Sequence, residues 1–97
     1  MIVVWLQDAL DDRRENLLYI AEKDPLAAID QGERIEKQID GLVAFPEKGR
    51  PGRKKGTREL VIQGTSFIAL YRIKPRLKRV EIFRLLHGAQ QWPGLRE

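Results

Sequence analysis

The stretch TRELVIQGTSFIALYRIKPRLKRVEIFRLL, residues 57–86, decides the fold. Its β-branched, aromatic and other apolar residues come in short runs, and two interruptions, Gln63-Gly64 and 74–78, contain turn-forming residues. The pattern predicts three strands, at 57–62, 66–73 and 79–86. Short connections make neighbouring strands antiparallel, so these three should form a meander.

Before the meander, the spacing of apolar residues predicts one strand followed by two helices. Residues 2–6 (IVVWL) are β-branched and aromatic and predict a first strand. From Asp8 to Lys23 apolar residues recur at helical spacing. Asp24-Pro25 predicts a second helix, because Asp caps free amides and Pro at the first helical position gives up no hydrogen bond. Phe45-Pro46 ends that helix.

This order of elements, β-α-α-β-β-β followed by a tail, predicts an α+β fold. Two amphipathic helices must bury their apolar faces, so we expect an antiparallel helical hairpin on one face of a mostly antiparallel four-stranded sheet. The other face of the sheet is then partly open. Gly88 ends the last strand, and 89–97 is expected to be a short helix or an irregular tail.

Length and composition limit the kind of protein. The chain has 97 residues, of which 42% are apolar, and no cysteine, so a single domain over 1–97 is expected. The missing cysteines and single histidine argue against a disulfide scaffold and a metal site, and no cofactor is expected. No apolar run approaches a membrane span, and the N-terminus does not resemble a signal peptide. We therefore expect a cytoplasmic protein with no membrane partner.

Charge is divided unevenly along the chain. Residues 1–47 sum to −6 and residues 48–97 to +10. Six of the eleven residues in 48–58 are basic and none is acidic, and the glycines and proline of 47–56 predict a mobile loop. Such a loop is expected to contact a nucleic-acid backbone or an acidic protein, and the alternative is a set of solvated strand and loop positions.

Several segments carry a family resemblance when they are taken in order. They are Tyr19-Ile20-Ala21 with Asp24-Pro25 and Ala27-Ala28, GRPGRKKGTRELVI (49–62), FIALYRI (67–73) and VEIFRLLHGAQQWP (80–93). Together they resemble the RelE/ParE superfamily of toxins from bacterial type II toxin–antitoxin modules, over nearly the whole chain. The resemblance implies a small toxin that is kept inactive by a cognate antitoxin wrapped around it.

The resemblance leaves two targets open. RelE-like members cut mRNA in the ribosomal A site, whereas ParE-like members inhibit DNA gyrase without an active site of their own. The basic C-terminal half favours the ribosome and mRNA as partners, and so a metal-independent, ribosome-dependent endoribonuclease is the first hypothesis. Gln90, where much of the family has Arg, and the lack of an obvious acid/base pair favour the alternative, a gyrase inhibitor. A plain RNA-binding domain without toxicity is the third.

A metal-free ribonuclease needs a base, an acid and cations around the reacting phosphate. His87 is the natural acid or base, and RelE-like relatives place a basic residue, His or Tyr in a similar position. Arg58 and Arg84 are the candidate catalytic cations. The alternatives are a His87 bonded to a backbone carbonyl and an Arg58 paired with a helix carboxylate.

The remaining candidates are side chains for binding RNA or another target. They are Arg50, Arg53, Lys54, Lys55, Arg72 and Trp92. Tyr71 lies in an apolar row with Phe67 and Ala69 and is assigned to the core. Strict alternation in the last strand would put Arg84 on one face with Ile82 and Leu86, and Glu81, Phe83, Leu85 and His87 on the other.

Overall fold

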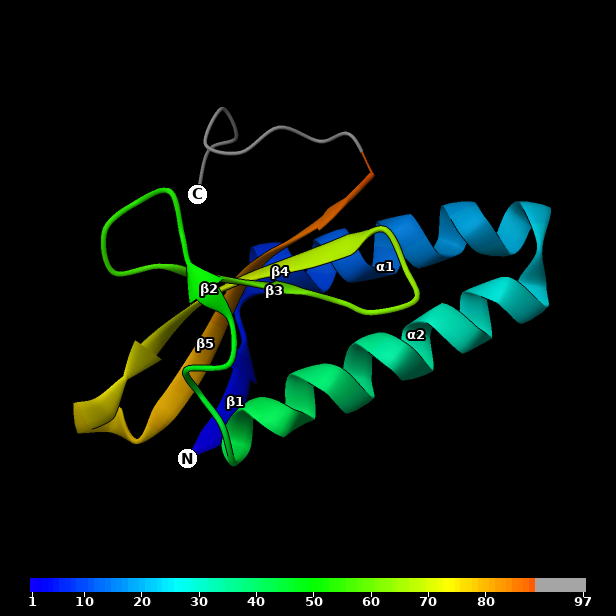
Figure 1. Cartoon of the computed structure of the whole chain (residues 1–97). Helices are drawn as coiled ribbons and strands as arrows, with labels where there is room; N and C mark the ends of the chain where they lie inside the picture. The colour runs from blue at the N-terminus through cyan, green and yellow to red at the C-terminus, as the bar shows by residue number, and fades with distance from the viewer. Residues whose placement is uncertain (89–97) are drawn as a thin grey trace.

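The computed structural model describes residues 1–88 and contains a helical hairpin on a five-stranded sheet (Figure 1). The elements are β1 (Ile2–Trp5), α1 (Gln7–Lys23), α2 (Pro25–Asp40), the 3₁₀ turn η1 (Gly41–Val43), β2 (Arg50–Pro51), β3 (Arg58–Val61), β4 (Phe67–Lys74), the 3₁₀ turn η2 (Pro75–Leu77) and β5 (Arg79–His87). The strand order is β1-β5-β4-β3-β2. β1 runs parallel to β5, and all other pairs are antiparallel. The antiparallel meander of β3, β4 and β5 was predicted.

The sheet has five strands instead of the expected four. The additional strand, β2, lies inside the segment that was predicted to be only a loop, and it pairs Arg50 with Glu59 and Pro51 with Arg58. Pro51 is tolerated because β2 is an edge strand, where a missing N–H costs no ladder bond. The predicted tail, 89–97, lies outside the described residues.

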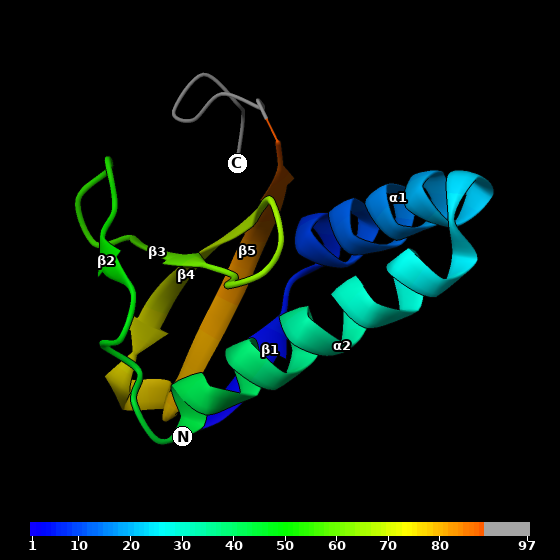
Figure 2. The ribbon, with the colours of Figure 1, turned by 45° about the vertical axis from the view of Figure 1, so that its right-hand side comes forward.

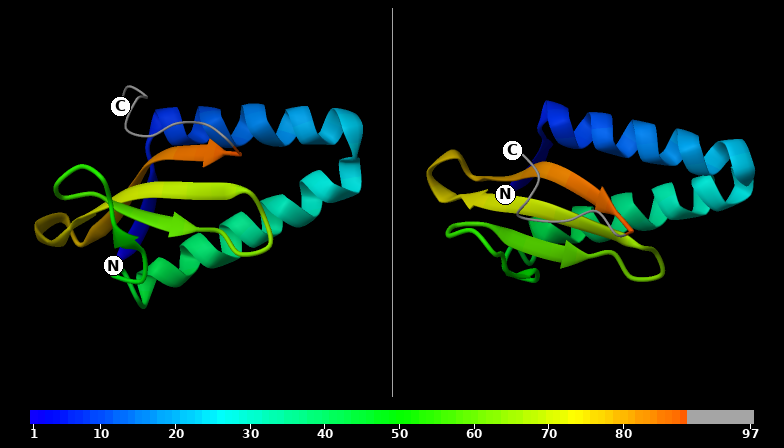
Figure 3. Two further views of the ribbon diagram at one scale, coloured as in Figure 1. Left: turned by 45° about the horizontal axis from the view of Figure 1, so that its top comes forward. Right: turned by 90° about the horizontal axis from the view of Figure 1, so that it is seen from above.

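Asp24 separates the two helices in the way that its position before Pro25 predicts. Its carboxylate accepts a hydrogen bond from the Ala27 N–H at 3.1 Å, and Pro25 is the first residue of α2. The chain therefore turns back at once, and both helices of the hairpin lie on the same side of the sheet (Figures 2 and 3).

The main core lies between the hairpin and the sheet. Its fully buried members from the helical segments are Ala9, Ile35, Ile39 and Leu42. The sheet side contributes Leu60, Ile62, Phe67, Ala69, Tyr71, Val80, Ile82 and Leu85. The assignment of Tyr71 to the core is confirmed, since the side chain is fully buried in this cluster.

A β-bulge interrupts the pairing of β4 with β5. Leu70 is paired with Arg84, whereas the next residue, Tyr71, is paired with Ile82. Phe83 is thus an extra residue on β5. An extra residue reverses the faces on which the following side chains lie.

The strict alternation expected for the last strand is therefore wrong. Ile82 packs in the helix-facing core together with Leu85, although the two are an odd number of positions, three, apart. Phe83 and Leu86 instead join Leu70 in a second apolar cluster. The bulge is a tertiary feature that the local sequence pattern does not show.

Candidate functional site

The basic loop folds back on itself to form a closed hairpin. The Gly52 N–H donates to the Thr57 carbonyl at 2.7 Å, and the Thr57 hydroxyl donates to the Lys54 carbonyl at 2.6 Å. These bonds leave Arg53, Lys54 and Lys55 exposed at the tip. Three of the residues proposed for binding a target thus lie together on one turn.

Arg50 lies at the base of the same hairpin and, unlike the residues at the tip, forms an ion pair within the hairpin. Its guanidinium nitrogens lie 3.0 Å (Nε) and 2.9 Å (Nη2) from Oε1 of Glu59, which is almost completely buried. The positive charge of Arg50 is therefore balanced at the directly opposite strand position. This pair fastens β2 to β3.

Arg58 and Tyr71 hold the chain that leads into β2. Arg58 donates hydrogen bonds to the carbonyls of Glu47 (3.2 Å) and Gly49 (2.7 Å). The sequence alternative for Arg58 was an ion pair with a carboxylate of a helix, and these backbone acceptors take its place. The Tyr71 hydroxyl accepts from the Gly49 N–H at 2.9 Å and donates to the Pro46 carbonyl at 2.7 Å. Burial raises the pKa of the Tyr71 hydroxyl, which keeps this donor protonated.

Arg84 forms a bidentate ion pair with Asp12 of α1. The Nε–Oδ2 and Nη2–Oδ1 distances are 2.7 and 3.0 Å, and the two side chains are 15% and 14% exposed. Asp12 also accepts a hydrogen bond from the Leu85 N–H at 2.9 Å. β1 ends opposite Ile82, so this carboxylate satisfies an N–H on the uncovered edge of β5. The hydrogen bond to Asp12 raises the pKa of Arg84.

His87 and Arg72 both lie against aromatic rings. The His87 imidazole stacks on the buried ring of Phe67 with centroids 4.3 Å apart and an interplanar angle of 27°. The Arg72 guanidinium lies 4.1 Å from the centre of the Phe83 ring. Each contact stabilises the residue in its place on the sheet.

Of the three residues proposed for catalysis, His87 and Arg58 lie apart on the sheet. His87 is opposite Phe67, and Arg58 is opposite Tyr71, four residues along β4 and hence about 13 Å away. Arg84 is bound to Asp12. Trp92, the aromatic residue proposed for stacking on bases, lies outside the described residues. In the part of the chain that the structure describes, the exposed basic side chains of the loop lie together, whereas His87 and Arg58 do not.

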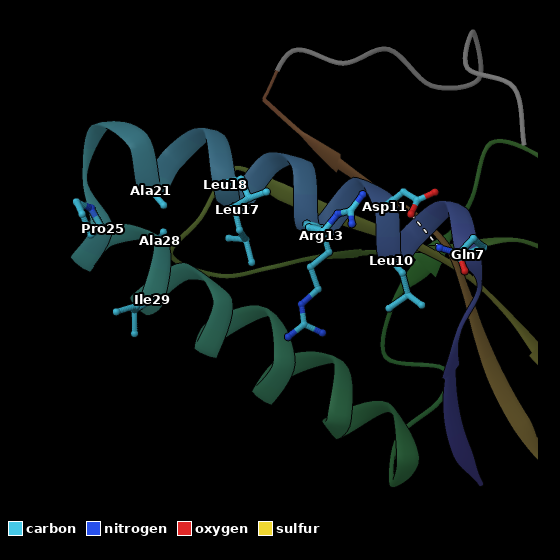
Figure 4. A pocket seen from close by; sticks show the side chains of 11 residues that line it. Gln7, Leu10, Asp11, Arg13, Leu17, Leu18, Ala21, Pro25, Ala28 and Ile29 are labelled. Carbon is cyan, nitrogen blue, oxygen red and sulfur yellow. Dashed lines mark hydrogen bonds between the residues drawn. The ribbon is translucent and has the colours of Figure 1, made fainter.

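A groove runs along the helical hairpin between α1 and α2 (Figure 4). Its volume is about 740 Å³, and its lining is largely apolar, with Leu17 at its base and the exposed side chains of Leu10, Leu18 and Ile29 along it. Arg14 lies at the same surface. The groove is long, open and amphipathic.

The sequence does contain a signal for this groove. Leu26 and Ile29 lie outside the apolar stripe expected on the second helix, and the structure leaves them 77% and 59% exposed. Leu18, which belongs to the helical pattern expected for the first helix, is also 59% exposed. Apolar residues beyond the width of a single core-facing stripe indicate a second apolar surface on a helix.

Residues 1–88 contain no group of three or more His, Cys, Asp or Glu side chains placed to hold a metal ion. No helix among them is long and apolar enough to cross a membrane.

The fold and its surfaces define a class: a small α+β protein that presents a basic hairpin at one end and an apolar groove on its helices. The chain belongs to the family described as the ParE toxin of the type II toxin–antitoxin system parDE, whose model matches residues 3–92. It is thus a member of the RelE/ParE superfamily, as the sequence predicts.

Known relatives agree with this family. The protein called "Putative toxin Y4kP" in Sinorhizobium fredii is 43% identical over 89 residues, which are 92% of this chain and 90% of that one. A structure of the chromosomal ParDE system of P. aeruginosa is 27% identical, covers 90% of this chain and 95% of its own, and has a TM-score of 0.79. The RelBE2 complex of Mycobacterium tuberculosis shares the fold, with 22% identity, a TM-score of 0.59 and coverage of 93% and 92%.

Proposed function

We propose that this toxin inhibits growth by binding DNA gyrase in a ParE-like manner, without cleaving RNA. The observation that carries the proposal is the structural use of the side chains that cleavage would require. Arg84 is held by both oxygens of Asp12, and Arg58 binds the carbonyls of Glu47 and Gly49. Ribosome-dependent mRNA cleavage, the first hypothesis from the sequence, becomes the second candidate.

General acid–base catalysis needs its groups within hydrogen-bonding reach of one reacting site. His87 and Arg58 are separated by about 13 Å along β4. At these positions the Arg58 guanidinium is bound to the Glu47 and Gly49 carbonyls, and the His87 ring is stacked on Phe67. Membership in the ParE toxin family and the ParDE structure with a TM-score of 0.79 support the same choice.

The His87→Phe variant separates the two candidates. Phenylalanine keeps an aromatic ring to stack on Phe67 but cannot transfer a proton. We expect the variant to inhibit gyrase supercoiling within about threefold of the parent, since loss of a general acid or base would cost about 10²–10⁴-fold. The measured quantity is the concentration of purified toxin that halves the supercoiling activity of gyrase.

The same two proteins are then added to a translation reaction in which mRNA ends are mapped. Intact message together with inhibited supercoiling supports the proposal. Ribosome-dependent cuts that the parent makes and His87→Phe does not make would replace it with the RelE-like mechanism. Circular dichroism of both proteins provides the control for folding.

We also propose that a cognate antitoxin inserts an amphipathic helix into the groove between α1 and α2. The ParDE and RelBE2 structures are toxin–antitoxin systems, which supports a partner of this kind. A helix about 10 Å wide fits a long, open groove whose exposed residues include Leu10, Leu18 and Ile29. Arg14 at the rim favours acidic residues on the incoming helix.

Leu18→Glu tests this docking site. A carboxylate in the groove would be desolvated by the incoming helix and would repel its acidic residues, so we expect binding of the antitoxin encoded beside the toxin to weaken at least 30-fold or so. Isothermal titration calorimetry measures the change. Val43→Glu is the matched control, because Val43 is also exposed but lies on η1. Equal affinity of the two variants would contradict the site.

A further inference from the structure

A second basic turn lies between β4 and β5. The sequence from 74 to 79, KPRLKR, has four bases in six residues and spans the end of β4, η2 and the start of β5. Arg76 and Lys78 are exposed, and Lys74 is half-buried. Arg79 is bound to Glu81 at 2.8 Å, so it adds little to the outward charge.

The other three cations of this turn are Lys74, Arg76 and Lys78, of which the last two are exposed. Within residues 1–88, the side chains of Lys74, Arg76 and Lys78 make no hydrogen bond or ion pair. Their charges therefore contribute nothing to holding the fold together by specific contacts. A concentration of three such charges in one turn raises the electrostatic potential at this point of the surface.

The basic turn and the basic loop lie at the same end of the sheet. In the antiparallel order β5-β4-β3-β2, the β2–β3 and β4–β5 connections must leave the same end of the sheet, and all views show them there, opposite the tip of the helical hairpin (Figures 1–3). The connections are two strand spacings apart across the sheet, about 10 Å, and the turn begins at Lys74, three residues along β4 from the partner of Arg58. A hollow of about 250 Å³ lies against the loop, lined by Pro51, Gly56, Thr57 and Arg58 and by Ile73 of β4.

Lys78 has a backbone conformation that does not suit lysine. Its φ and ψ are 51° and 43°, the left-handed region that favours glycine or asparagine. Among residues 1–88 the lysine side chain makes no hydrogen bond or ion pair in return. A role for its charge at the surface would account for a lysine there.

We propose that the turn 74–79 and the loop 50–58 form one two-part surface that binds the phosphate backbone of a nucleic acid. Protein interfaces have an apolar centre, but among these two segments Leu77 is the one large apolar residue that is exposed. A duplex carries about one negative charge per 1.7 Å of its axis and can engage both cationic tips at once. This proposal is independent of the proposed gyrase target, because the isolated chain is expected to bind nucleic acid without gyrase.

The test measures binding of the purified chain to 30-base-pair duplexes of DNA and of RNA by fluorescence anisotropy over a range of NaCl concentrations. The Lys74→Gln/Arg76→Gln/Lys78→Gln variant should bind at least tenfold more weakly. Its slope of log affinity against log salt should be shallower by about two to three units, as expected for three lost phosphate contacts. The duplex bound more tightly identifies the natural polymer.

Two further variants keep the proposal falsifiable. Lys78→Gly relieves the left-handed backbone strain and so keeps the fold, yet it should weaken binding about threefold to tenfold. Lys23→Gln removes the same charge from the far end of the molecule, at the end of α1, and should leave binding unchanged. Equal losses in Lys23→Gln and Lys78→Gly, or no binding of either duplex by the parent chain, would overturn the proposal.

Discussion

Asp12→Ala should lower the free energy of unfolding by about 3–5 kcal/mol, the cost of removing one partner from a largely buried ion pair. The Arg84 guanidinium would keep its charge but lose both carboxylate oxygens, at 2.7 and 3.0 Å. The Leu85 N–H would also lose its acceptor at the uncovered edge of β5. Both losses affect the contact between α1 and the sheet.

Urea unfolding followed by far-UV circular dichroism measures this change. Glu15→Ala is the matched control, because Glu15 is an exposed acid one turn further along α1. It should change the free energy of unfolding by less than about 0.5 kcal/mol. An Asp12→Ala protein as stable as Glu15→Ala would show that the ion pair does not hold the helix to the sheet.

Asp12→Leu/Arg84→Leu should recover part of the loss seen in Asp12→Ala. Replacing both members of a buried pair by apolar side chains removes the desolvated charge as well as its partner. The Leu85 N–H still lacks its acceptor in this double variant, so recovery should be incomplete. A double variant less stable than Asp12→Ala would contradict the explanation by uncompensated charge.

Gly49→Ala should destabilise the protein by about 3 kcal/mol, at the upper end of ordinary overpacking costs. A Cβ at Gly49 would lie 2.6 Å from the Tyr71 hydroxyl, 2.7 Å from Cε1 of the same ring and 2.8 Å from the Glu59 carbonyl. Neither the buried ring nor the strand backbone can move aside easily. Displacing residue 49 would also break its N–H bond to Tyr71.

Gly41→Ala is the control for this second substitution. Gly41 has helical φ and ψ of −61° and −19°, and a Cβ there meets no atom within 4 Å. Alanine should therefore raise stability by about 0.5–1 kcal/mol, since it restricts the unfolded chain. Thermal unfolding of both variants measures the difference, and a harmless Gly49→Ala would contradict the close packing around Tyr71.

The strands, the helices and the helix junction could be predicted because they rest on local chemistry. Asp24 caps α2 and Pro25 begins it, whatever lies elsewhere in the chain. The strand boundaries agree to within one or two residues for the same reason. The two-residue strand β2 was missed, because its pairing with β3 depends on the loop folding back through Gly52 and Thr57.

The contacts of the candidate site residues were harder to predict from the sequence than the helices and strands. Clustering of Arg53, Lys54 and Lys55 follows from their neighbouring positions in one loop. The partners of Arg50, Arg58 and Arg84 do not, since Asp12 is 72 residues from Arg84 in the chain. A list of basic residues shows how much positive charge is present but not how much of it is used inside the fold.

The sequence alone determined the α+β class, the family and the position of the basic loop, because strand and helix periods, caps and turn residues act over a few neighbouring positions. Only the tertiary structure decided which faces of β5 meet the helices, because a single extra residue at Phe83 reverses them. It also decided that Arg84 and Arg58 make contacts within the fold and that the turn 74–79 and the loop 50–58 lie at the same end of the sheet. Such pairings depend on which distant segments the sheet brings together, and no local pattern contains that information.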